Sequence, residues 1–108
     1  MFRSAAMGVL LLVGMASLAS AQDKAKGEAV YTAQKCSLCH SVAGKGNPKG
    51  ALDDVGNKLK ADELRMWITD AKAMTAKTKA TRKPDMKAYT LPKEDVDNLD
   101  AYLQTLKK

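Results

Sequence analysis

Residues 36–40 are Cys36-Ser37-Leu38-Cys39-His40, and they contain both cysteines and the only histidine of the 108-residue chain. The spacing C-x-x-C-H is the pattern of covalent haem attachment. Two thiols at this spacing can add to the two vinyl groups of one haem and form two thioether bonds. The histidine that follows is then held under the iron, for which an imidazole nitrogen is a common axial ligand. The motif therefore predicts one covalently bound haem c per chain.

Three other uses of the same residues fit the sequence less well. A Cys36–Cys39 disulfide would suit an oxidising compartment. A thioredoxin-like redox pair needs a βαβ context, and the sequence shows no convincing strand. A structural zinc site normally takes four Cys or His ligands, whereas this chain supplies three, all within five residues. Haem attachment uses all three side chains.

The first 21 residues have the pattern of a secretory signal peptide. Arg3 gives a short positive start, residues 5–18 are apolar, and Ala19-Ser20-Ala21 is a small-residue cleavage site. An uncleaved membrane anchor is the alternative, but a spanning helix needs about 20 apolar residues and this run is shorter. We therefore expect cleavage after Ala21 and a periplasmic protein without stable membrane insertion, because bacteria attach haem covalently outside the cytoplasm.

Residues 22–108 then form one small domain. A chain of this length has a limited apolar core and usually needs a further stabilising element, which a covalently bound haem would provide. The full chain carries a formal net charge of +6. Such an excess is typical of proteins that bind nucleic acid, an anionic membrane surface or an acidic protein. Export makes nucleic acid an unsuitable partner.

Apolar periodicity predicts helices separated by loops, and therefore an all-α fold. One helix covers about residues 23–35 with Asp23 as N-cap, a second covers about 62–72 with Asp62 as N-cap, and the last begins at Thr90 or Leu91. The basic stretch 73–83 has uncertain helix content. Residues 41–56 are glycine-rich and form a loop, with a short turn near Asp53-Asp54-Val55.

Each predicted helix has an apolar face. These faces are Gly27, Val30 and Tyr31; Leu64, Trp67, Ile68 and Ala71; and Val96, Leu99, Leu103 and Leu106. Tyr102 flanks the last face and is expected to pack on the first helix. Trp67, the only tryptophan, points inward as a core residue, and its indole N–H can also serve a haem propionate because a buried indole N–H seeks a partner.

The order of these features resembles the small monohaem class I c-type cytochromes: a helix, C-x-x-C-H, a glycine loop, a helix, a methionine-bearing loop, and a last helix containing Ala101-Tyr102-Leu103. The similarity covers residues 23–108. It implies thioether bonds at Cys36 and Cys39, His40 as proximal ligand, a distal methionine ligand, and first and last helices that cross. The fold it implies has about three main helices and loops wrapped around one covalent haem.

Two departures from that family concern the ligand loops. Gly50-Ala51-Leu52 stands where the family often has Gly-Pro-x-Leu. The proline carbonyl of the family accepts a hydrogen bond from the histidine ring, and here we expect the carbonyl of Ala51 to do so. Met86-Lys87 stands where the family often has Met-Pro.

Three methionines after the signal peptide compete for the distal position. Met66 lies within a regular helix. Met74 sits just past that helix and remains a competitor. Met86 follows Pro84 in an irregular segment that lets its thioether reach inward, and it lies shortly before the last helix, where the family places its ligand. We therefore predict His40 and Met86 as the two iron ligands.

The function implied by the resemblance is one-electron transfer by a monomeric carrier that is not an enzyme. Lys45, Lys49, Lys83 and Lys87 lie in the two loops expected to flank the haem, and they predict a basic docking surface for acidic redox partners. A haem protein that binds a gas or peroxide at an open sixth site is one alternative. A dedicated cytochrome subunit of a larger oxidoreductase is another.

Overall fold

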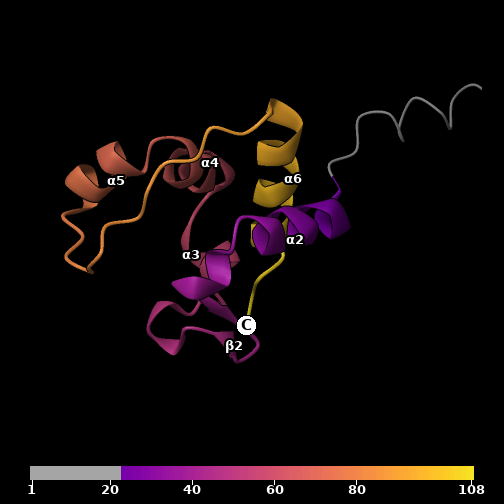
Figure 1. Ribbon diagram of the computed structural model, residues 1–108, viewed down its shortest axis with the longest axis horizontal. Coiled ribbons are helices and arrows are strands. Elements are labelled where there is room, and N and C mark those ends of the chain that lie inside the picture. Colours follow the sequence, from indigo (N-terminus) through magenta and orange to yellow (C-terminus); the bar gives the residue numbers. More distant parts are fainter. Residues whose placement is uncertain (1–22) are drawn as a thin grey trace, which may run out of the picture.

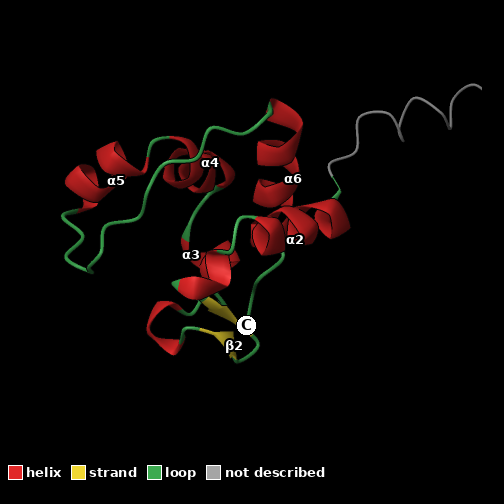
Figure 2. Cartoon of the chain, viewed as in Figure 1, coloured by secondary structure: helices red, strands yellow, loops and turns green. Residues whose placement is uncertain are grey.

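Helices make up most of residues 23–108, which are the residues that the computed structural model describes (Figure 2). The predicted signal peptide lies outside this range. The α-helices are α2 (Lys24–Ala33), α3 (Val55–Lys58), α4 (Ala61–Thr69), α5 (Ala71–Thr78) and α6 (Lys93–Gln104); the 3₁₀ helices are η2 (Cys36–Leu38) and η3 (Pro48–Gly50); the strands are β1 (Ser41–Val42) and β2 (Lys45–Gly46). The prediction of an all-α fold is confirmed.

The first and last helices, α2 and α6, pack against each other, as the resemblance implied (Figure 1). Asp23 caps α2 as predicted, since its carboxylate accepts the N–H of Lys26 at 3.0 Å. The N–H of Asp23 in turn donates to the Asn98 side chain on α6 at 2.9 Å. The rings of Tyr31 and Tyr102 meet edge to face with centroids 5.8 Å apart, a favoured aromatic geometry.

The hydrophobic core lies between three helices. Its buried members are Tyr31 from α2, Leu64 and Ile68 from α4, and Val96, Leu99 and Leu103 from α6. Leu106, just beyond the end of α6, is partly buried against this cluster. Trp67 is only half-buried and lies outside the core cluster, so the prediction that it points into the core is not met.

Three predicted helix boundaries were wrong. Helix α4 begins at Ala61, where the Glu63 carboxylate accepts the N–H of Lys60 at 2.8 Å, so Asp62 lies in the first turn and is not the N-cap. The same helix ends at Thr69, because Asp70 leaves the helical region at φ −147° and ψ 55°. Helix α6 begins at Lys93 after Pro92, not at Thr90 or Leu91.

The glycine-rich loop contains structure that the sequence did not indicate. Strands β1 and β2 form a two-residue antiparallel hairpin. Its turn residues Ala43 and Gly44 both have positive φ, 53° and 81°, as a tight primed turn requires. The predicted short turn is present at Asp53-Asp54, where the N–H of Val55 donates to the carbonyl of Leu52 at 3.1 Å, and it leads into α3, which was not predicted. The hairpin and α3 fold residues 41–58 next to the C-x-x-C-H motif.

Candidate haem-attachment site

The C-x-x-C-H motif forms a single turn of backbone directly after α2. Lys35 has a left-handed conformation, φ 58°, and ends the helix before the motif begins. The carbonyl of Cys36 then accepts the N–H groups of both Cys39 and His40, at 3.1 and 2.9 Å. Both cysteines are free thiols. The turn therefore presents two unpaired thiols and one imidazole from the same short stretch of chain.

The two thiols differ in their surroundings. Cys36 is half-buried and packs against the hydrophobic core. This burial raises the pKa of its thiol, because a buried site disfavours the charged thiolate. Cys39 is exposed. A group bonded to both sulfurs would thus have one attachment against the core and the other at the surface.

The ring of His40 is fixed by its backbone neighbour. Its Nδ1 lies 2.9 Å from the carbonyl oxygen of Gly50. Because a carbonyl only accepts, Nδ1 carries the proton in the neutral ring and the lone pair lies on Nε2, the arrangement of a metal-binding histidine. Burial lowers the pKa of His40 and favours this neutral form. The predicted acceptor, the carbonyl of Ala51, was wrong by one residue.

The hairpin holds the motif from the other side. The N–H of Asn47 donates to the carbonyls of His40, at 2.9 Å, and of Ser37, at 3.2 Å. Gly46 lies against the His40 carbonyl with φ 112°, and a side chain there would overlap that oxygen. Neither Asn47 nor Gly46 was predicted as a site residue, because their contacts depend on a hairpin too short to show in the sequence.

The segment that joins α5 to α6, residues 79–92, is the Met86 loop. It returns to the C-x-x-C-H turn, since the Arg82 guanidinium donates to the carbonyl of Cys39 at 2.6 Å. Its far end is tied to α4 by the N–H of Tyr89, which donates to the carbonyl of Ile68 at 2.8 Å. Burial raises the pKa of Tyr89, and the nearby Cys36 and Cys39 raise it further. Residues on both sides of Met86 are therefore close to the motif.

The three candidate methionines have different surroundings. Met86 is half-buried within the Met86 loop. Met74 is 3% exposed and belongs to α5, whereas Met66 is 39% exposed on α4. Met74 lies in regular helix and outside the core cluster. Arg82 and Tyr89, on either side of Met86, thus lie near the C-x-x-C-H turn, whereas Met74 is held within the regular geometry of α5.

Trp67 and Tyr31 are the remaining candidate polar groups. Among residues 23–108, the indole of Trp67 takes part in no intramolecular hydrogen bond. Tyr31 is 7% exposed, and its hydroxyl has no hydrogen-bond partner within the same residues. The pKa of Tyr31 is raised to about 12, mainly by burial and next by the nearby Cys36. The Tyr31 hydroxyl thus lies beside the attachment turn, a feature that the sequence analysis did not single out.

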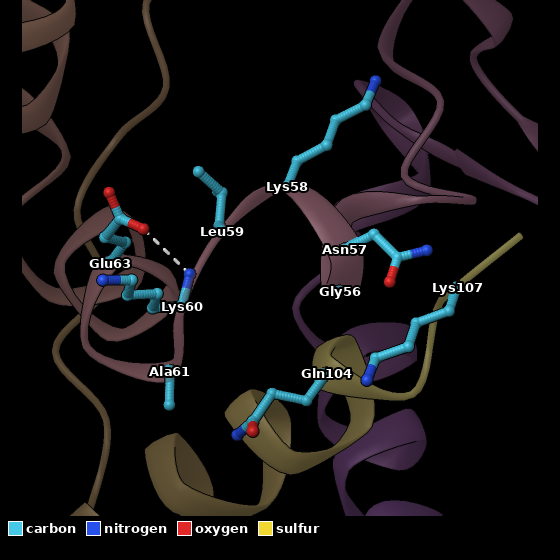
Figure 3. A pocket seen from close by; sticks show the side chains of 9 residues that line it. All are labelled: Gly56, Asn57, Lys58, Leu59, Lys60, Ala61, Glu63, Gln104 and Lys107. Atoms are coloured by element: carbon cyan, nitrogen blue, oxygen red, sulfur yellow. Dashed lines mark hydrogen bonds between the residues drawn. The ribbon is translucent and has the colours of Figure 1, made fainter.

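A separate cavity of about 340 Å³ lies between α3, the start of α4 and the chain end after α6 (Figure 3). None of the motif residues lines it. Figure 3 shows Lys58 directed away from the opening, while Lys107 extends towards Gln104. Glu63 is occupied by its bond to the N–H of Lys60. This cavity is distinct from the candidate haem site.

The fold and the motif together define a small all-α protein built around a haem-attachment turn. Comparison with known families matches residues 24–107 to the family Cytochrome c. The chain therefore belongs to the Cytochrome c family, whose members bind covalently attached haem c with its iron and transfer electrons through it. Searches of curated proteins and of solved structures returned no match.

The chemistry of the described residues fits this group. Haem c needs two free thiols at C-x-x-C spacing and a histidine with an available Nε2, and the turn provides all three. No set of three or more His, Cys, Asp or Glu side chains within residues 23–108 is arranged to hold a bare metal ion. Likewise, no helix in that range is both long and apolar enough to cross a membrane.

Proposed function

We propose that this protein is a periplasmic carrier of single electrons whose haem iron is ligated by His40 and Met86. The observation that carries the proposal is the convergence of the C-x-x-C-H turn and the Met86 loop, joined by the Arg82–Cys39 hydrogen bond. Export is supported by the signal-peptide pattern of residues 1–21. Membership of the Cytochrome c family supports electron transfer.

The chain contributes attachment, orientation and burial, while the bound haem supplies the one-electron chemistry of its iron. Cys36 and Cys39 are the proposed thioether positions. His40, oriented through its hydrogen bond to Gly50, is the proposed proximal ligand. The chain has no other histidine, so the imidazole that binds iron leaves none for acid–base chemistry on the opposite side. This supports a carrier function without enzymatic activity.

Met86 is the proposed distal ligand because the loop that carries it is irregular and anchored on both sides. Arg82 joins the loop to Cys39, and Tyr89 joins it to Ile68. Met74 is fixed on α5 by regular helix geometry. A Met/His pair raises the reduction potential relative to other ligand sets, which suits a carrier between higher-potential partners.

Replacing Met86 with Ala tests this ligand assignment. We expect the ferric protein to lose the weak near-infrared band of a methionine–iron bond, the reduction potential to fall, and carbon monoxide to bind the ferrous form. Met74→Ala, the matched control, should keep the band. A band that survives in Met86→Ala and disappears in Met74→Ala would assign the ligand to Met74. An absorption spectrum without the band in the unmodified protein would instead support an open sixth site.

Trp67 is proposed as a further contact of the haem, through its indole N–H and a propionate. Its half-buried position on α4 and its indole N–H, which bonds to none of residues 23–108, support this role. A buried or half-buried indole N–H gains from a hydrogen-bond acceptor.

The docking surface is proposed to lie on α5 and the Met86 loop. Residues 71–88 contain six basic residues and one acidic residue, whereas the rest of residues 23–108 contains eleven of each sign. All six basic residues are exposed: Lys72, Lys77, Lys79, Arg82, Lys83 and Lys87. Lys45 and Lys49 are exposed as well. They belong to the rest of residues 23–108, in which basic and acidic residues are equal in number. The charge therefore favours an acidic partner that approaches this one end of the molecule (Figure 1).

Charge reversal tests the docking surface with the anionic reagent ferrocyanide as electron donor. The double variant Lys77→Glu and Lys79→Glu should slow reduction of the ferric protein by about tenfold at low salt, with less salt dependence than the unmodified protein. The control, Lys107→Glu and Lys108→Glu, makes the same change of net charge at the chain end. Equal rates for the two double variants would contradict a localised surface.

A further inference from the structure

The Met86 loop reaches the C-x-x-C-H turn through one long-range hydrogen bond. Arg82 Nη2 donates to the carbonyl oxygen of Cys39 at 2.6 Å, across 43 positions of sequence. Within the loop, Lys83 bonds to Asp85 at 2.8 Å, which ties the loop only to itself. Among the described residues, the Arg82 bond is thus the hydrogen bond that joins residues 81–88 to another part of the fold.

Gly50 provides the space in which the guanidinium lies. A Cβ placed on Gly50 would meet the carbonyl of Cys39, Nη1 of Arg82 and Nδ1 of His40, and it has no other neighbour as near. Gly50 does not have positive φ, so its lack of a side chain matters here for space and not for backbone conformation. The guanidinium therefore fills the volume that a side chain at position 50 would take.

The hydrogen bond that orients His40, the proposed proximal ligand, lies beside the same guanidinium. His40 Nδ1 lies 2.9 Å from the Gly50 carbonyl oxygen, and the Arg82 guanidinium lies beside Gly50 and donates to the carbonyl of Cys39, the residue before His40. A permanent positive charge beside an iron-ligating ring disfavours the more positive oxidised iron. Hydrogen bonds in this outer shell also set ligand orientation and redox potential. Arg82 can thus act on both iron ligands, one through the loop and one through the ring.

We propose that Arg82 is a positioning residue that clamps the Met86 loop onto the C-x-x-C-H turn, restrains the distal ligand against displacement, and raises the reduction potential. This inference rests on the proposed His40/Met86 ligation. It assigns the control of that ligation to one side chain. Arginine suits the task because one nitrogen of its planar guanidinium donates to the Cys39 carbonyl while the other lies beside Gly50, whereas lysine offers a single point of charge.

Three variants of the haem-bound protein separate charge from geometry. Arg82→Ala removes both, Arg82→Lys keeps the charge without the fork, and Lys83→Ala removes a neighbouring exposed charge whose partner lies within the loop. Two properties are measured in each: the midpoint potential by spectroelectrochemical titration, and the binding of imidazole to the ferric form, which requires displacement of the distal ligand.

We expect Arg82→Ala to bind imidazole about tenfold more tightly, the factor for losing one charge-assisted hydrogen bond. Its equilibrium constant for reduction should fall by about threefold. Arg82→Lys should keep a potential close to that of the unmodified protein yet bind imidazole more tightly than it does. Lys83→Ala should match the unmodified protein in imidazole binding. If Arg82→Ala and Lys83→Ala behave alike in both measurements, the proposal is overturned.

The same measurements distinguish a wrong ligand assignment from a wrong role for Arg82. Absence of the methionine–iron band in the unmodified protein would reject the proposed ligation, whatever Arg82 does. If the band is present and imidazole binding is unchanged in Arg82→Ala, the ligation stands and the clamp is rejected.

Discussion

Gly27 shows how a single residue determines the packing of the two terminal helices. A Cβ at this position would overlap the backbone carbonyl of Asn98 and crowd the Cβ of Tyr102. The absence of a side chain therefore lets α2 approach the backbone of α6. The apolar face Gly27-Val30-Tyr31 could be predicted from sequence, but the need for glycine could not, because it depends on a neighbour 71 positions away.

Replacing Gly27 with Ala should destabilise the protein by about 2 kcal/mol, within the usual range for overpacking. Helix propensity alone predicts the opposite sign, since Ala favours a helix over Gly by about 1 kcal/mol. Denaturant unfolding of the haem-bound protein measures the difference. Ala29→Gly, an exposed exchange in the same helix, serves as the propensity control. A Gly27→Ala variant more stable than the unmodified protein would contradict the close approach.

The hydrogen-bond acceptor of His40 was predicted to within one residue, since it is Gly50 and not Ala51. The resemblance to the cytochrome family implied the carbonyl of Ala51 as the acceptor for His40, but the structure uses the carbonyl of Gly50. A one-residue shift of this kind is set by η3 and by the parallel bridge between Ser41 and Ala51. Neither of these features has a periodic pattern in the sequence.

At the scale of elements, helices with strong apolar periodicity were predicted and weakly patterned ones were not. The faces of α2, α4 and α6 were predicted largely correctly; the exceptions are Trp67, which is half-buried, Ala71, which belongs to α5, and Leu106, which lies beyond the end of α6. The boundary between α4 and α5 was missed because residues 71–78 are rich in Ala, Lys and Thr and show no clear apolar face. Only the backbone of Asp70 separates the two helices.

Helices α4 and α6 are joined by a charged contact at Asp97. Its carboxylate pairs with Arg65 of α4 and, at 2.7 Å, with Lys93 one turn earlier on α6. These hydrogen bonds, from Lys93 first and Arg65 second, hold the pKa of Asp97 below its usual value. A carboxylate with a lowered pKa stabilises the fold when ionised. Its contribution is therefore present above the ordinary pKa of about 3.9 and is lost as the pH falls through the folded value.

We expect Asp97→Asn to lower the melting temperature at pH 7 and to have a smaller effect at pH 3, where part of the stabilisation by the ionised carboxylate is already lost. Asp95→Asn, on the same helix, makes the same change of charge and should have the smaller effect at pH 7, because Asp95 forms no ion pair among the described residues. Thermal unfolding followed by circular dichroism at both pH values checks this. A loss of stability that is equal at pH 7 and pH 3 would show that the pairs of Asp97 contribute nothing.

At the scale of the whole molecule, the basic segment 71–88 contacts the turn that is proposed to attach the haem. The excess of positive charge lies in residues 71–88, which include most of the Met86 loop. The loop meets the attachment turn through Arg82. A partner attracted by this charge would therefore be steered to the part of the molecule where the haem is proposed to bind, which raises the rate of productive encounters.

The overall charge and the haem motif could be predicted from sequence, whereas the convergence of the two could not. That convergence depends on a contact between residues 39 and 82, and no periodic pattern reports contacts at such a separation. The core that the polypeptide itself provides is small. Six buried hydrophobic residues form the described cluster, and a domain of this size usually requires a further stabilising element.

Covalent attachment of one haem through Cys36 and Cys39 is the claim on which the whole account depends. The most direct measurement is the intact mass of the protein purified from a periplasmic fraction, before and after acid–acetone extraction. We predict the mass of residues 22–108 plus one haem, unchanged by extraction. A mass equal to the polypeptide alone, or a haem that the extraction removes, would contradict the account.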